Sequence, residues 1–123
     1  FVRPERFGAV GFCAGGGNCF ALAVNSPDIV ASVPFYPSPL PAAAQLDRLA
    51  GPVLMMLGHQ DRFVTSPAAG LVPTLIQQQR VFGLHIYEGA QHAFLNDTGN
   101  AYNRAAACDA WAKTVEFLGR HLR

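Results

Sequence analysis

The stretch from Arg6 to Val24 constrains the fold more than any other part of the chain. A short apolar segment at 7–12 is followed by three consecutive glycines at 15–17 and then by an apolar run with helical spacing. This pattern indicates a strand that turns directly into a helix. Because the segment is apolar throughout, we expect a strand that is buried on both faces, as in parallel sheets.

A single cysteine lies at this turn, within Gly11-Phe12-Cys13-Ala14-Gly15. The pattern is the G-x-S-x-G nucleophile elbow with cysteine in place of serine. A sharp strand-to-helix turn strains its apical residue, and glycines flank that residue because larger side chains would collide. The helix N-terminus next to the sulfur favours a thiolate and an oxyanion, since free amides and the helix dipole stabilise negative charge.

Other interpretations of the glycine cluster fit less well. A dinucleotide-binding loop requires G-x-G-x-x-G, but Cys13 occupies the position of its second glycine, and a phosphate-binding loop requires a lysine that is absent nearby. Considered as an isolated residue, Cys13 is better interpreted as a small buried hydrophobic side chain. A nucleophilic role depends on histidine and acidic partners later in the chain.

Composition excludes several classes of protein. The 123 residues suit one small domain over 1–123, and half of them are hydrophobic, which is enough for a core. Charged residues make up 14% with a net charge of +1, so we expect neither a nucleic-acid partner nor a polybasic membrane tail. No apolar run is long enough to span a membrane, and no signal peptide precedes the elbow.

The chain has three cysteines, Cys13, Cys19 and Cys108. An odd number without a secretion signal argues against a disulfide framework and favours a reducing, cytoplasmic compartment. The spacing of Cys13 and Cys19 is not typical of a zinc site, so no metal is expected. Cys19 and Cys108 are interpreted as core residues on helices.

Strands and helices alternate along the rest of the chain. After a lead-in at 1–5 and the first strand, the patterns predict further strands at 29–36, 53–58 and 81–88 and helices at 14–25, 42–49, 66–79 and 103–122. Pro73 predicts a kink or a late start in the third helix. The last helix is expected to place five residues near one face: Ala106, Trp111, Val115, Leu118 and Leu122. The alternation predicts an α/β fold with about four parallel strands flanked by helices.

Three predicted strand ends carry a residue that can take part in catalysis. Cys13 follows the first strand, Asp61 the third and His92 the fourth, and ligands bind at the carboxyl ends of parallel strands. The order nucleophile, acid, histidine is that of the α/β-hydrolases. His92 can take the thiol proton and return it to a leaving group, while Asp61 orients the imidazole.

Each partner also has a simpler interpretation. Asp61 could be a turn residue that bonds its own backbone, and His92 could be an ordinary loop histidine. His59 is a rival base, although it directly follows a strand and would compete with Asp61 for space. His85 is expected in the core or at a sheet edge, and His121 is expected to face solvent.

With these residues in place, the chain resembles the dienelactone hydrolase family, the cysteine branch of the α/β-hydrolases. The motifs are Gly11–Gly16, Gly58–Val64 and Tyr87–Phe94, with further likeness at 96–98, 102–103 and 107–111. The resemblance covers essentially the whole chain but only the C-terminal half of longer family members. It implies a truncated α/β-hydrolase fold that hydrolyses small esters or lactones through an acyl-thioester, without a cofactor.

The resemblance also implies roles for individual residues. Cys13, Asp61 and His92 would form the catalytic triad, and the amide of Ala14 would serve the oxyanion hole. Substrate binding would involve Phe12, Phe94 and Asn96, the last standing where the family has an arginine for the substrate carboxylate. A second oxyanion donor belongs to the half that this chain does not match. The alternative is therefore a non-catalytic binding or assembly module that retains the triad residues.

The missing half has a structural consequence. Without its neighbours, the elbow strand at 7–12 becomes an open apolar edge, which favours association. We therefore expect a homodimer or larger symmetric assembly that covers the elbow strand or the adjacent apolar face. A redox-sensing role for Cys13 is less favoured, because Cys19 lies too far along the same helix to act as a resolving cysteine.

Overall fold

The computed structural model describes residues 6–122, so the lead-in expected at 1–5 lies outside the described residues. Its centre is a sheet of four parallel strands in the order β1 (Phe7–Phe12), β2 (Ile29–Phe35), β3 (Val53–Gly58) and β4 (Phe82–Tyr87). Parallel neighbours cannot be joined by hairpins, so each connection crosses over the sheet. The predicted α/β fold with four parallel strands is confirmed.

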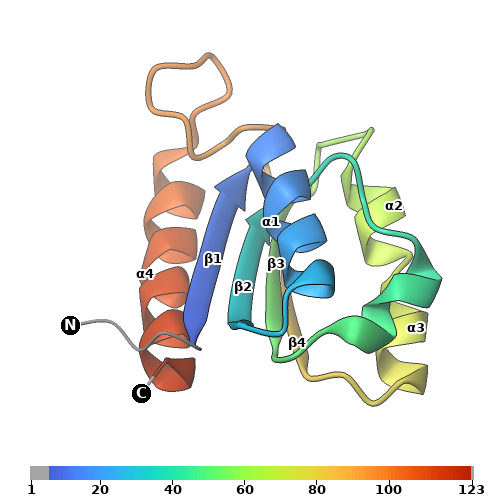
Figure 1. The fold of residues 1–123 in the computed structure, drawn as a ribbon. Helices are drawn as coiled ribbons and strands as arrows, with labels where there is room; N and C mark the ends of the chain where they lie inside the picture. Colours follow the sequence, from blue (N-terminus) through green and yellow to red (C-terminus); the bar gives the residue numbers. More distant parts are fainter. Residues whose placement is uncertain (1–5, 123) are drawn as a thin grey trace.

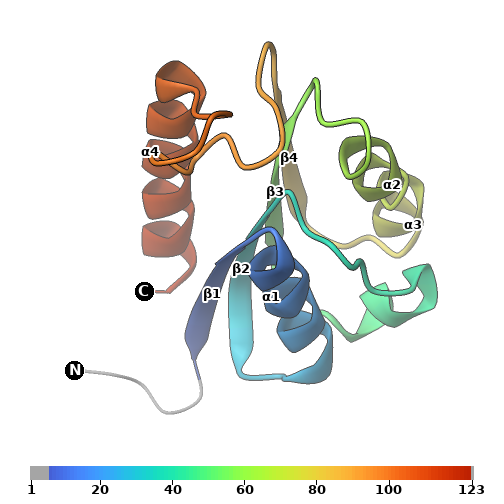
Figure 2. The same ribbon diagram turned by 90° about the horizontal axis from the view of Figure 1, so that it is seen from above.

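Helices cover both faces of this sheet. They are α1 (Ala14–Asn25), the 3-10 helix η1 (Ala43–Arg48), α2 (Thr65–Ala69), α3 (Val72–Gln77) and α4 (Arg104–His121). Figures 1 and 2 show α1, α2 and α3 on one face and α4 on the other. Because the four strands are parallel, their carboxyl ends lie at the same end of the sheet, which is the upper end in Figure 1. None of the helices in the described part of the chain is both long and apolar enough to cross a membrane.

Local sequence explains where the helices begin and end. The side chain of Asn103 accepts a hydrogen bond of 3.1 Å from the amide of Ala106 and caps α4. The helix predicted at 66–79 is two short helices, because α2 ends at Ala69 with Gly70 as its C-cap, and Pro73 lies in the first turn of α3. Proline is favoured there, since the first turn leaves its amides without intrahelical partners. The structure therefore shows an interruption in place of the kink or late start expected from Pro73.

Burial differs sharply between the strands. Every residue of β3 is buried, whereas β1 leaves Phe7 39% and Phe12 40% exposed. The expectation that the first strand is buried on both faces is therefore wrong. The reason is its place in the sheet, because β1 is the terminal strand and pairs only with β2. The expected open apolar edge is present at β1 among residues 6–122.

The apolar face predicted for α4 is split between core and surface. The buried positions are Ala106, Ala107, Ala110 and Thr114. Trp111 and Val115 instead leave 49% and 55% of their surface exposed, so the predicted apolar face is only partly buried. A Cβ built on Gly8 would lie 2.9 Å from both Leu118 and Leu122, which places this side of α4 over β1. Trp111 and Val115 share that side by helical spacing.

The two cysteines other than Cys13 differ from each other in burial. Cys19 is 4% exposed and lies in the core, as predicted, and burial raises the pKa of its thiol to about 11. Cys108 is exposed on α4, so its predicted place in the core is wrong. The helical pattern did not distinguish the core face of α4 from the neighbouring apolar stripe.

Candidate active site

Cys13 occupies the turn between β1 and α1 in a strained conformation, with φ 59° and ψ −117°. Left-handed φ values are unfavourable for residues with a side chain, so the surroundings must hold this one in place. Its amide donates a hydrogen bond of 3.1 Å to the carbonyl of Phe35, at the end of β2. Its carbonyl accepts from the amides of Gly17 at 3.0 Å and Ser38 at 3.2 Å. The turn is therefore fixed by α1 and by the neighbouring strand end.

The glycines of the elbow differ in how much space surrounds them. A Cβ on Gly11 would lie 2.0 Å from the carbonyl oxygen of Gly15, and one on Gly16 would lie 2.4 Å from that of Phe35. These two positions exclude any side chain, as the steric argument predicts. A Cβ on Gly15 would meet no heavy atom within 4 Å. The second glycine of the motif is therefore not required by packing within residues 6–122.

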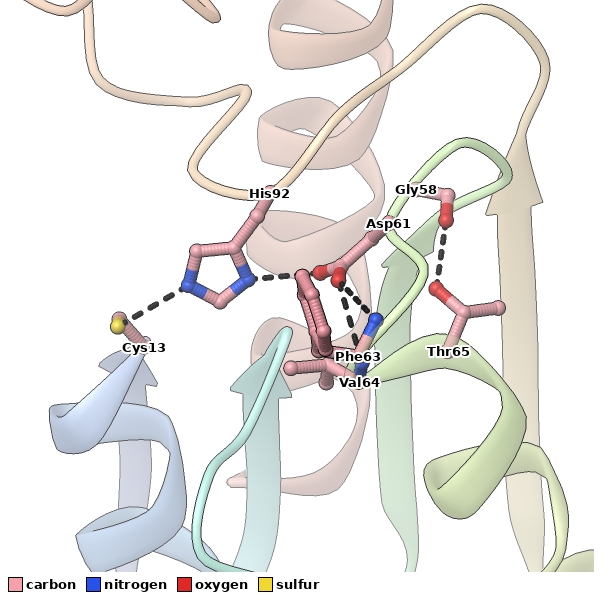
Figure 3. Close-up of polar contacts among 7 residues, drawn as sticks. All are labelled: Cys13, Gly58, Asp61, Phe63, Val64, Thr65 and His92. Carbon is pink, nitrogen blue, oxygen red and sulfur yellow. Dashed lines mark hydrogen bonds and ion pairs between the residues drawn. The ribbon is translucent and has the colours of Figure 1, made fainter.

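Asp61 lies in the loop after β3 and is 5% exposed. Its Oδ1 accepts hydrogen bonds from the amides of Phe63 at 3.2 Å and Val64 at 3.1 Å. Figure 3 shows that the other carboxylate oxygen points toward His92. The two interpretations of Asp61 are therefore compatible, because one oxygen organises the turn and the other remains free for the histidine.

His92 lies between the carboxylate and the sulfur (Figure 3). Its Nδ1 is 2.7 Å from Oδ2 of Asp61, and its Nε2 is 3.1 Å from Sγ of Cys13. A histidine that donates from Nδ1 presents Nε2 as an acceptor for the thiol proton. Such an arrangement can convert a thiol into a thiolate and hold the resulting imidazolium against a carboxylate. The rival base His59 is exposed, and its amide bonds the carbonyl of Tyr87.

A cavity of about 350 Å³ opens beside the sulfur and is lined by Phe12, Cys13, Tyr36, Ala93, Leu95 and Asn96. Three of these residues have positive φ values, 59° at Cys13, 34° at Tyr36 and 64° at Ala93. Strained backbone of this kind concentrates at functional sites, where the surrounding structure holds it. The cavity is therefore the candidate substrate site.

The structure places the predicted binding residues differently from one another. Phe12 and Asn96 line the cavity, and Ala14 is the first residue of α1, where helix amides are unpaired. Phe94 is fully buried and packs against the rings of Phe35, Tyr36 and Tyr87. The expectation that Phe94 contacts a substrate directly is therefore wrong for this structure, because its ring is buried and does not line the cavity.

Sequence reasoning missed three lining residues, Tyr36, Ala93 and Leu95. Tyr36 directly follows β2, and that position at a carboxyl strand end was the available signal. Its ring centroid lies 5.0 Å from that of His92, and burial raises the pKa of Tyr36 to about 12. The hydroxyl therefore stays protonated at neutral pH. Ala93 and Leu95 are apolar residues of a loop, which carry no chemical signal of their own.

The remaining histidines lie apart from this site. His85, in β4, is half-buried with its ring centroid 6.2 Å from that of Tyr87, and burial lowers its pKa, followed by the charge of Lys113. His121 ends α4 and is also half-buried, so the expectation that it faces solvent is only partly met. Within residues 6–122, no group of three or more potential metal ligands lies together.

The parallel sheet, the elbow and the site at the strand ends define a partial α/β-hydrolase fold. The model of the Dienelactone hydrolase family matches residues 1–122, and the chain belongs to that family. Among solved structures, one titled m3DLH has a TM-score of 0.87 and 23% identity, and the match covers 99% of this chain and 55% of that one. At this identity the structural likeness shows the fold alone.

Curated relatives are similarly matched over part of their length. A Saccharolobus solfataricus protein assigned as a carboxymethylenebutenolidase is 37% identical over 119 residues, which are 94% of this chain and 45% of the relative. The carboxymethylenebutenolidase of Rhodococcus opacus is 33% identical over 133 residues, covering 96% of this chain and 51% of the relative. The chain therefore spans about half the length of these relatives.

Proposed function

We propose that this chain carries the catalytic half of a hydrolase for small esters or lactones, with Cys13 as nucleophile, His92 as base and acid, and Asp61 as its orienting carboxylate. The observation that supports this most strongly is the continuous line of contacts at 3.1 Å and 2.7 Å from sulfur to imidazole to carboxylate. It ends at a cavity with room for a substrate. The name of the Rhodococcus relative, carboxymethylenebutenolidase, supports a lactone or ester bond as the target.

The reaction proceeds in two steps. His92 accepts the thiol proton at Nε2, and the thiolate attacks the substrate carbonyl carbon, whose electron pair moves to the oxygen. The amide of Ala14, at the N-terminus of α1, donates to this oxyanion. When the carbonyl re-forms, the C–O bond breaks and the alkoxide takes the proton from His92, leaving an acyl-thioester. His92 then deprotonates a water that attacks this thioester, which releases the acid and restores the thiol.

The direct test compares Cys13→Ala with Cys108→Ala, because both remove a thiol but only one is placed in the site. With 4-nitrophenyl acetate, we expect Cys13→Ala to lose hydrolysis to the background rate and Cys108→Ala to retain the rate of the unsubstituted chain. Circular dichroism checks that both variants fold. Equal turnover by Cys13→Ala and the unsubstituted chain would refute the proposal.

The chemistry also needs a compartment that keeps Cys13 reduced, such as the cytoplasm.

A second candidate is a non-catalytic binding or assembly module that keeps the same side chains. It is favoured by the coverage of 45–51% in the two named relatives. Such elbows ordinarily use a second amide donor from another loop, and within residues 6–122 the amide of Ala14 is the one donor that we assign to this role. Loss of one oxyanion donor slows related hydrolases by about 100- to 1,000-fold. If the folded chain reacts with thiol reagents at Cys13 but turns over no ester, this second candidate is the better description.

We also propose that a second copy of the chain covers the open edge of β1. The edge is apolar, with Phe7 39% exposed, and the stripe formed by Trp111 and Val115 continues it on the same side of α4. An unpaired apolar strand is a template for association, and a symmetric dimer would remove it. Residues 7–12 and this stripe together form the proposed interface.

A further inference from the structure

Among residues 6–122, the lining of the cavity beside Cys13 offers an acyl group no lysine or arginine as a partner. Its lining consists of two aromatic residues, two aliphatic residues, Cys13 and Asn96, with no lysine, arginine, aspartate or glutamate among them. A carboxylate moved into apolar surroundings without a cation loses its hydration and gains nothing in return. A neutral acyl chain instead gains from leaving water. The lining therefore distinguishes substrates by charge.

Asn96 is the one amide side chain of this lining, and its oxygen is already engaged. Oδ1 accepts from the amide of Thr98 at 3.1 Å and from the hydroxyl of Thr98 at 2.8 Å. These two bonds hold the side chain within its own loop. A neutral amide fixed in this way offers only the two N–H donors of its NH₂ group, each of which makes a weaker bond to a carboxylate than a charged donor does.

Two charged groups near the cavity, the imidazole of His92 and the carboxylate of Asp97, do not change this balance. His92 reaches the sulfur, but Asp61 lies 2.7 Å from its other nitrogen, so a positive imidazole is offset by the carboxylate. The adjoining hollow shares Leu95 with the cavity and carries Asp97 in its own lining. A second negative group on the substrate would be repelled by Asp97 rather than attracted.

We infer that the cavity beside Cys13 selects esters and lactones with a neutral, apolar acyl group over those that carry a carboxylate on it. The inference rests on the proposed function, since the sulfur that lines the cavity would bond to the acyl carbon. The acyl group would then remain against Phe12, Leu95 and Tyr36 through both steps. Selectivity of this kind arises because a charged chain must be left unpaired where a neutral one packs.

The test uses two esters of matched length, 4-nitrophenyl hexanoate and mono(4-nitrophenyl) adipate, with the spontaneous rates subtracted. We expect kcat/KM to be about tenfold or more higher for the hexanoate. The reason is that the terminal carboxylate of the adipate loses water in the cavity without gaining a charged partner. Asn96→Arg should shift this ratio toward the adipate by about tenfold, because it adds a charge-assisted donor to the lining. Asn100→Arg, which adds the same charge to the same loop outside the lining, should leave the ratio unchanged.

A second measurement separates failure of this inference from failure of the proposed function. The rates at which N-butylmaleimide and N-(3-carboxypropyl)maleimide modify Cys13 need the thiol and the cavity but no turnover. We divide the rate for N-butylmaleimide by the rate for N-(3-carboxypropyl)maleimide, at Cys13 and for free glutathione. The ratio at Cys13 should exceed the ratio for glutathione. Turnover of both esters at equal kcat/KM would overturn the inference and leave the proposed function intact. Absence of turnover would refute the proposed function. The maleimide rates would then decide the selectivity, and a ratio at Cys13 equal to the ratio for glutathione would overturn the inference.

Discussion

At the scale of single residues, Asp61 combines two tasks that a substitution can separate. Its Oδ1 accepts from the amides of Phe63 and Val64, while Oδ2 contacts His92. Asp61→Asn keeps an oxygen for the loop amides but presents an amide nitrogen to His92, which favours the wrong tautomer. In a comparable triad this change lowers kcat by about 10,000-fold. We expect a loss of that order in ester hydrolysis with little change in melting temperature.

Asp61→Ala is the matched control, because it removes both oxygens. It should lose hydrolysis to a similar extent and also lower the melting temperature, since the part-buried amide of Phe63 and the buried amide of Val64 lose their acceptor. If Asp61→Asn retains kcat within a few-fold of the unsubstituted chain, the orienting role is wrong and the residue serves only the turn.

At the scale of elements, the elbow joins β1 to α1 by a turn that tolerates a methyl group at one glycine but not at another. Gly11→Ala would place a Cβ 2.0 Å from a backbone oxygen, whereas the corresponding atom at Gly15 has no neighbour within 4 Å. We expect Gly11→Ala to lower the free energy of unfolding by about 1–3 kcal/mol or more, as overpacking does. Gly15→Ala, within a helix, should raise it by about 0.5–1 kcal/mol. Urea unfolding measures both, and equal destabilisation would contradict the steric account.

At the scale of the whole molecule, the open side of β1 and the exposed stripe on α4 predict self-association. Trp111→Lys places a charge in the proposed interface and should shift the chain toward monomer in sedimentation velocity. Ile76→Lys is the control, because Ile76 is 62% exposed on α3, on the opposite face of the sheet. A chain that is monomeric without any substitution at micromolar concentration, or a dimer that Trp111→Lys leaves intact, would contradict the proposed interface.

Much of the fold could be predicted because its signals are local. The helix at 14–25 and the strand at 53–58 have the predicted bounds. The helix opens at the glycine cluster and stops before Ser26-Pro27-Asp28, and the strand is an uninterrupted apolar run between Gly51-Pro52 and Gly58. Pro73 predicted a disturbance of the helix expected at 66–79, which is interrupted between α2 and α3. The exposure of Trp111 and Cys108 could not be predicted, because helical spacing identifies an apolar stripe but not whether another surface covers it.

The sequence by itself determined which residue types stand at the strand ends and in what order, because a strand, a turn and a helix are each written in a few neighbouring positions. Only the tertiary structure decided that His92 lies within reach of Cys13, 79 residues away, and of Asp61, 31 residues away. It also decided that Phe94 packs beneath the site while Tyr36 and Leu95 line it. Distances of this kind depend on how the sheet aligns its strand ends, and no local pattern encodes them.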